Sequence, residues 1–187
     1  MSIAVLDNAA IRERAIPISV EQYHQMNEWG SISVKTELIE GVILEKMSKS
    51  PLRTYLIHLL YDFLVQQLSK TYLVRKEDPL TLTHSELEPD ISIVKGHITD
   101  FKIAHPTYAE LVIEVAVSSL EIDRVKTRVY AIAEIPECWV VIPTQKEVEV
   151  YKQPQQGKYQ VVQIYKDMEQ IETVEGLVLK LKAIFFD

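Results

Sequence analysis

Glu88-Pro89-Asp90-Ile91-Ser92-Ile93-Val94 decides the fold together with a second stretch that follows after a loop, Leu111-Val112-Ile113-Glu114-Val115. Both are short and rich in β-branched residues, so each predicts a β-strand. Asp90 stands at the head of the first strand, after a proline that favours an extended backbone, and Glu114 stands inside the second. If the two strands are neighbours, their carboxylates converge and can bind a divalent cation of the Mg²⁺ type.

Each carboxylate has a simpler explanation that the sequence leaves open. Strand alternation places Glu114 on the same face as Val112 and Ala116, where an ionised carboxylate is costly unless it is paired or bound to a metal. The alternative is an edge-strand glutamate that faces water or pairs with an arginine. For Asp90 the alternative is a turn, since Glu-Pro-Asp is a common turn sequence.

The remaining pattern predicts an α/β class of fold, with a mixed sheet flanked by helices. Ser19 begins a short helix that ends near Gly30, and Ser50-Pro51 begins a longer one. A third helix is expected over residues 121–134, with an apolar face made of Ile122, Val125, Val129 and Ile132. Further strands are expected at 72–74, 138–142, 148–152, 159–165 and 177–181, with two short strands around a tight turn or bulge at 37–45 and a C-terminal hairpin extension.

Length and composition limit the class of protein. A chain of 187 residues with 47% hydrophobic and 25% charged residues fits one domain, which we expect over residues 19–187 after an N-terminal arm of residues 1–18. No apolar run is long enough for a membrane helix, and the N-terminus does not resemble a signal peptide. Since Cys138 is the single cysteine, no intramolecular disulfide can form, and we expect a cytoplasmic protein.

Four segments in a fixed order carry a resemblance to a known family. They are Thr36-Glu37-Leu38-Ile39-Glu40-Gly41, Glu88-Pro89-Asp90-Ile91-Ser92, the stretch from Leu111 to Leu120, and Asp123-Arg124-Val125-Lys126 with Tyr130 and residues 135–141. From about Ser19 to the C-terminus the chain resembles the Uma-two family of restriction-endonuclease-like proteins, within the PD-(D/E)XK nuclease superfamily. The resemblance implies a restriction-endonuclease-like core.

The same resemblance implies roles for particular residues. Asp90 and Glu114 match the two acidic ligands of a Mg or Mn ion, and the backbone carbonyl of Val115 completes the inner shell. Ala116 stands where the superfamily's simplest form has lysine, and Lys126 matches a lysine relocated to the following helix. Relocation preserves the chemistry, because the cation needs only to reach the attacking water or the scissile phosphate. The alternative for Lys126 is a solvated helix surface.

Five other charged residues are candidates for supporting roles. Glu37 and Glu40 match the family's first acidic motif, so one of them can support the metal site; alternatively both lie on a solvated strand face. Arg53, Arg124 and Arg128 are expected to contact nucleic-acid phosphates.

The leading functional hypothesis is a metal-dependent nuclease that hydrolyses DNA phosphodiester bonds, acting as a homodimer by analogy with the superfamily. An alternative is a catalytically lapsed nuclease fold that binds nucleic acid or protein without cleaving it. A third is hydrolysis of another phosphoester on the same scaffold. A simple DNA-coating protein is disfavoured, because the formal net charge is −7 and phosphate backbones are bound mainly by Lys and Arg.

Overall fold

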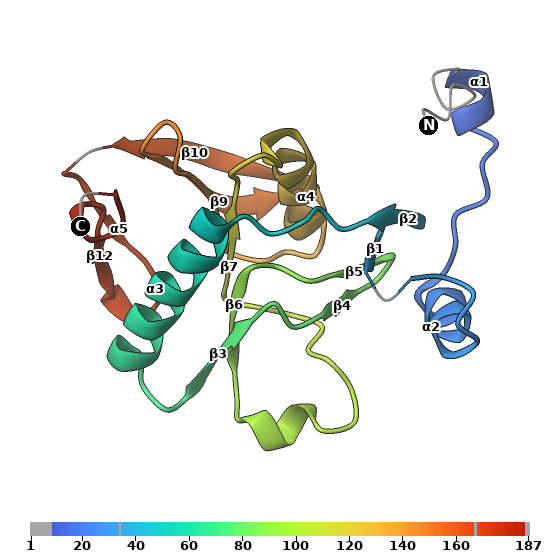
Figure 1. Cartoon of the computed structure of the whole chain (residues 1–187), viewed down its shortest axis with the longest axis horizontal. Coiled ribbons are helices and arrows are strands. Elements are labelled where there is room, and N and C mark those ends of the chain that lie inside the picture. Colours follow the sequence, from blue (N-terminus) through green and yellow to red (C-terminus); the bar gives the residue numbers. More distant parts are fainter. Residues whose placement is uncertain (1–8, 34, 167, 186–187) are drawn as a thin grey trace.

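The structure is a computed structural model that describes residues 9–33, 35–166 and 168–185; residues 1–8 of the expected N-terminal arm lie outside the described residues. Its centre is a six-stranded sheet in the order β10-β9-β8-β7-β6-β3 (Figure 1). The strands are β3 (Tyr72–Lys76), β6 (Ile91–Lys95), β7 (Leu111–Val115), β8 (Glu137–Ile142), β9 (Glu147–Gln155) and β10 (Lys158–Lys166). The predicted mixed sheet is confirmed, because β7 and β8 are parallel while the other neighbouring pairs are antiparallel.

The two strands that carry the candidate carboxylates are neighbours. β6 pairs with β7 in antiparallel register, with Ile91 opposite Ile113. Asp90, just before β6, therefore lies beside the end of β7 that holds Glu114 and Val115. The parallel pair β7–β8 needs a crossover connection, and helix α4 (Leu120–Ile132) supplies it.

Helices cover both faces of this sheet. α3 (Pro51–Gln67) packs Leu60 and Leu64 into one hydrophobic core with Ile113 and Val115, whereas α4 packs Tyr130 into a second core with Val112. Because successive residues of a strand point to opposite faces, these two cores lie on opposite sides of β7. Ser50 begins α3 as predicted, since its hydroxyl accepts a hydrogen bond from the Arg53 amide.

A smaller antiparallel sheet, in the order β2-β1-β5-β4, brings a further segment next to the central sheet. Its strands are β1 (Thr36–Ile39), β2 (Val42–Glu45), β4 (Leu80–Leu82) and β5 (Ser85–Leu87); β4 and β5 are not predicted from the sequence. Glu40 and Gly41 form the tight turn between β1 and β2 with φ of 46° and 80°. A Cβ at Gly41 would come within 2.3 Å of Pro17 Cβ, so glycine is required there.

The ends of the chain add three short helices and a hairpin. α1 (Ala9–Arg12) has no buried residue and projects from the body (Figure 1), and α2 (Val20–Glu28) begins at the predicted cap, Ser19. The expected C-terminal hairpin is β11 (Gln170–Glu172) with β12 (Val178–Lys180), and α5 (Lys182–Phe185) follows it. Short 3₁₀ turns span Ile98–Phe101 and Val174–Gly176. No helix in the described ranges is long and apolar enough to cross a membrane.

The predicted apolar face of α4 is largely wrong. Val129 is buried, but Ile122, Val125 and Ile132 are 40%, 54% and 46% exposed. The helix instead buries a mostly polar face with Asp123, Lys126, Thr127 and Tyr130. The reason is tertiary: this face meets buried carboxylates of neighbouring strands, which offer the polar side chains partners that water would otherwise supply.

α3 provides a direct test of the packing. Leu60 is almost fully buried against the sheet, whereas Leu52 on the same helix is exposed. We expect Leu60→Ala to lower the free energy of unfolding by about 2–5 kcal/mol, because it removes buried methyl groups and leaves a cavity. Leu52→Ala is the matched control and should change it by less than about 0.5 kcal/mol. Urea unfolding followed by circular dichroism measures both; equal losses would contradict this packing.

Candidate functional site

Charged side chains from both sheets and both long helices meet around a cavity of about 70 Å³, where β6 begins and β7 ends. A water molecule needs roughly 10–15 Å³ of such space, so the cavity has room for several. We call six charged residues here the buried charge cluster: Glu37, Arg53, Asp90, Asp123 and Lys126 line the cavity, and Glu114 lies fully buried next to Lys126. All are buried except Arg53, whose side chain is 14% exposed.

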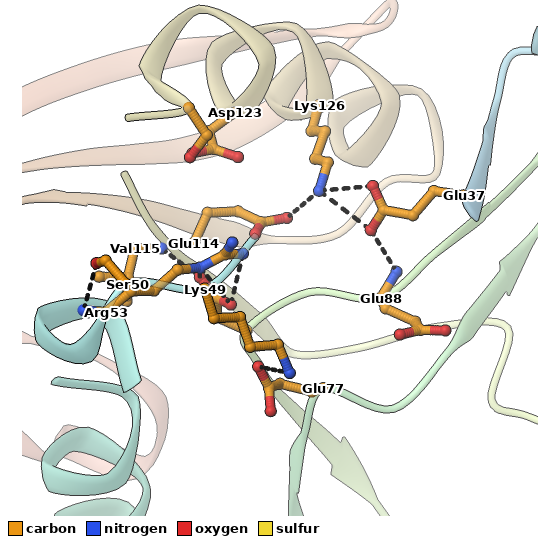
Figure 2. Close-up of polar contacts among 12 residues, drawn as sticks. Glu37, Lys49, Ser50, Arg53, Glu77, Glu88, Glu114, Val115, Asp123 and Lys126 are labelled. Carbon is orange, nitrogen blue, oxygen red and sulfur yellow. Dashed lines mark hydrogen bonds and ion pairs between the residues drawn. The ribbon is translucent and has the colours of Figure 1, made fainter. Parts of the chain in front are cut away.

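Lys126 lies at the centre of the cluster, between two carboxylates (Figure 2). Its Nζ is 3.5 Å from Glu114 Oε1 and 2.9 Å from Glu37 Oε2. Glu37 is fixed in turn, because its Oε1 accepts the backbone N–H of Glu88 at 3.0 Å. Lys126 is thus buried and paired on both sides, and it is not on a solvated helix surface.

Asp90 is bound by Arg53 and by the end of β7. Arg53 Nη2 donates to Asp90 Oδ1 at 2.8 Å, and Arg53 Nε lies 3.2 Å from both carboxylate oxygens. The Val115 amide donates to Asp90 Oδ2 at 2.7 Å. The Val115 carbonyl, expected as a metal ligand, accepts the Val117 amide at 3.2 Å and keeps a second lone pair.

Glu114 is fully buried but only partly satisfied. Its Oε1 accepts a hydrogen bond from the Tyr130 hydroxyl at 2.6 Å, in addition to the contact with Lys126. Its Oε2 has no hydrogen-bond partner among the described residues. An unpaired buried carboxylate oxygen is costly, so this atom marks a position where a ligand would be stabilising.

Asp123 and Tyr130 belong to the site, although the sequence predicts roles for Lys126, Arg124 and Arg128 of this helix and for neither of these two residues. Asp123 is buried and accepts a 2.5 Å hydrogen bond from Ser119 at the start of α4. A signal was available, because positions 123, 126 and 130 are separated by three and four residues and so share one helix face.

The structure keeps three of the sequence candidates apart from the cluster. Glu40 is exposed at the β1–β2 turn and lies 3.4 Å from Arg128, which is also exposed. Arg124 pairs with Glu149 of β9 at 2.5 Å. Of the two glutamates of the first acidic motif, therefore, Glu37 points into the cavity and Glu40 points away from it.

Burial dominates the electrostatics of the cluster. It raises the pKa of Glu114 to about 8, in spite of the nearby Lys126 cation, and it also raises the pKa values of Asp90 and Asp123. Burial opposes the charge of Lys126, but Glu114 and Glu37 outweigh it and raise the pKa of this lysine. Lys126 therefore stays protonated at neutral pH, and Glu114 holds a proton readily.

The residues fit a divalent cation with oxygen ligands. If every group of the cluster ionises, four carboxylates face two cations, which leaves two negative charges that a divalent ion would neutralise. Within the described part of the chain no group of three His, Cys, Asp or Glu side chains is arranged to hold a metal. In Mg²⁺ sites one or two carboxylates commonly bind the ion, and waters or phosphates complete the shell.

The fold and this cluster define an α/β protein of the restriction-endonuclease-like class. A solved structure described as "a putative nuclease belonging to DUF820", from Anabaena variabilis ATCC 29413, has the same fold with a TM-score of 0.74. It is 17% identical, and the alignment covers 90% of this chain and 98% of that one. The Uma2 family model, described as "Putative restriction endonuclease", matches residues 20–183, and the chain belongs to this family. No curated protein matches the chain.

Glu114 gives the metal-free protein a defined pH dependence. Its folded-state pKa of about 8 exceeds the ordinary value of 4.5, so the folded state holds the proton longer than the unfolded state does. The stability due to this group is complete below pH 4.5 and is lost as the pH rises to 8. The free energy of unfolding should fall by up to about 1.4 kcal/mol per pH unit in this window.

The slope can be measured by urea unfolding in EDTA. In Glu114→Gln the neutral amide replaces the titrating acid, so the decline should be shallower than in wild type, while the exposed-acid control Glu40→Gln should keep the wild-type slope. An unchanged slope in Glu114→Gln would show that another group titrates.

Proposed function

We propose that this protein is a Mg²⁺- or Mn²⁺-dependent nuclease that hydrolyses DNA phosphodiester bonds. The observation that carries the proposal is the buried ammonium of Lys126, held between Glu114 and Glu37 beside the cavity that Asp90 also lines. Burying a cation among carboxylates costs stability, and such sites are concentrated where chemistry is done. Membership of the Uma2 family, whose description is "Putative restriction endonuclease", supports the same activity.

Each residue of the cluster then has a role. Asp90 and Glu114 would hold the cation, with the Val115 carbonyl as a third oxygen. When bound, the cation polarises the phosphate and lowers the pKa of a water molecule. Lys126 remains protonated, so it donates hydrogen bonds to the water or to a phosphate oxygen and does not act as a base. Glu37 positions Lys126 through their ion pair.

Two further lysines are suited to bind the DNA backbone. Lys46 and Lys49 line the cavity mouth and pair there with Glu88 and Glu77 at 2.5 and 2.6 Å. A phosphate can replace these surface partners at little cost, because exposed ion pairs contribute little stability. Among the described residues that line the cavity, neither Arg124 nor Arg128 is present. These two arginines would contact more distant phosphates.

One observation favours a second candidate, a nuclease fold that binds nucleic acid or protein without cleaving it. Arg53 neutralises Asp90 directly, so the pair is satisfied without a metal ion. Calorimetric titration with Mn²⁺ separates the two candidates. Saturable binding that disappears in Asp90→Asn supports the enzyme, and no binding to wild type supports the non-cleaving module.

Plasmid cleavage tests the two acidic residues. In Mg²⁺ or Mn²⁺ the wild type should nick or linearise supercoiled DNA, and Asp90→Ala and Glu114→Ala should each reduce the rate by at least about a hundredfold, because each removes a cation ligand. Linearisation without accumulation of nicked circles would support the proposed homodimer, in which two sites cut opposite strands. Equal cleavage by all three proteins would sink the assignment.

Glu37 and Glu40 form a matched pair from the same strand and turn. We expect Glu37→Gln to lower kcat by about 10–100-fold with little change in KM for DNA, because it releases Lys126 from its position without removing a phosphate contact. Glu40→Gln should leave kcat within about twofold, since Glu40 points away from the cavity. Steady-state kinetics on a labelled duplex measures both; equal losses would mean that the two acids act through folding.

A further inference from the structure

We propose that Arg53 is an internal competitor for the metal site: its guanidinium covers Asp90 in the metal-free protein and must withdraw before Asp90 can bind a divalent cation. This inference rests on the proposed function, because it presupposes a cation at Asp90. It adds a step that neither the family nor the acid pair implies. In this step the guanidinium of Arg53 neutralises Asp90 until a metal ion replaces it.

The contacts at Asp90 already pair both oxygens of its carboxylate, and the guanidinium of Arg53 reaches both of them. A carboxylate has about four acceptor positions on its two oxygens. Arg53 Nη2 donates to Oδ1 at 2.8 Å, the single Nε–H of Arg53 is shared between both oxygens at 3.2 Å, and the Val115 amide donates to Oδ2 at 2.7 Å. The backbone contact is fixed by β7, so the guanidinium is the partner that has to leave.

Glu114 differs from Asp90 in this respect. Its Oε2 is buried and has no hydrogen-bond partner among the residues that the structure describes. Glu114 thus keeps one carboxylate oxygen without a partner, whereas both oxygens of Asp90 are paired. A cation that binds both carboxylates must displace the charge of Arg53 and not merely fill a vacant position.

Arg53 is placed so that it can withdraw without unfolding the helix. It belongs to the first turn of α3, where Ser50 holds its backbone amide, and its side chain is 14% exposed and lines the cavity. Rotation of the side chain would move the guanidinium toward the cavity mouth, near Lys46 and Lys49. Guanidinium binds phosphate well, so a phosphate at the mouth would stabilise the withdrawn position.

Mn²⁺ affinity, measured by calorimetry at fixed pH and ionic strength, tests the proposal directly. Arg53→Gln removes the competing charge, and we expect its Kd for Mn²⁺ to be at least tenfold lower than that of wild type. Arg53→Lys retains one charge but cannot cover both oxygens of Asp90, so its Kd should fall between the two. This variant also preserves a partner for Asp90 if Arg53→Gln folds poorly, which thermal unfolding checks.

Lys49→Gln is the matched control, because it removes one positive charge from the same cavity without touching Asp90. Its Kd for Mn²⁺ should change by less than threefold. Equal or weaker Mn²⁺ binding by both Arg53 variants would overturn the proposal, as would an equal gain in Lys49→Gln, which would indicate a general charge effect.

Plasmid cleavage by the same proteins separates this proposal from the proposed function. If Mn²⁺ affinity rises in the Arg53 variants but no protein cleaves DNA, the competition is real and the nuclease assignment fails. If wild type cleaves DNA and the Arg53 variants bind Mn²⁺ as wild type does, the nuclease assignment stands and the competition fails. If no protein binds Mn²⁺, both fail.

Discussion

The structure depends on the pairing of buried charges around Lys126. A buried ammonium or carboxylate without a partner is far more costly than one in water, so each member of the cluster needs another within reach. Lys126 satisfies this constraint through Glu37 and Glu114, and Asp90 satisfies it through Arg53. The pairs join a strand of the small sheet, two strands of the central sheet and both long helices. Removing Lys126 would leave the buried carboxylates of Glu37 and Glu114 without this cation, and removing Arg53 would do the same to Asp90.

This constraint explains features of the fold that hydrophobic burial does not. α4 turns a polar face toward the sheet and exposes much of its apolar one, because Asp123, Lys126 and Tyr130 have partners only on the inner side. The small sheet lies against the central one where Glu37 reaches Lys126. The observed arrangement of α4 brings Lys126 within reach of both Glu37 and Glu114.

A protein selected for stability would replace such a cluster with apolar residues of similar size, since buried ion pairs seldom add net stability. Four carboxylates, three of them paired with cations and one of these three left with an unpaired oxygen, are instead suited to a divalent ion and a phosphate. The raised pKa of Glu114 has the same cause, because burial without a bound ion favours the protonated acid. The buried carboxylates therefore lower the stability of the folded protein most when no cation is bound. Stability, its pH dependence and cation binding thus all depend on the same few atoms.

By itself the sequence determined the elements with strong local signals. Ser19 and Ser50 cap their helices, a glycine marks a turn or bulge between two short strands at 37–45, and alternation puts Glu114 on the face of Val112, because capping, turn geometry and strand period act over a few residues. Only the tertiary structure decided which charges pair: that Glu37 and not Glu40 meets Lys126, that Arg53 covers Asp90, and that α4 buries its polar side. These depend on residues up to 89 positions apart, and local propensity carries no information about contacts at that separation.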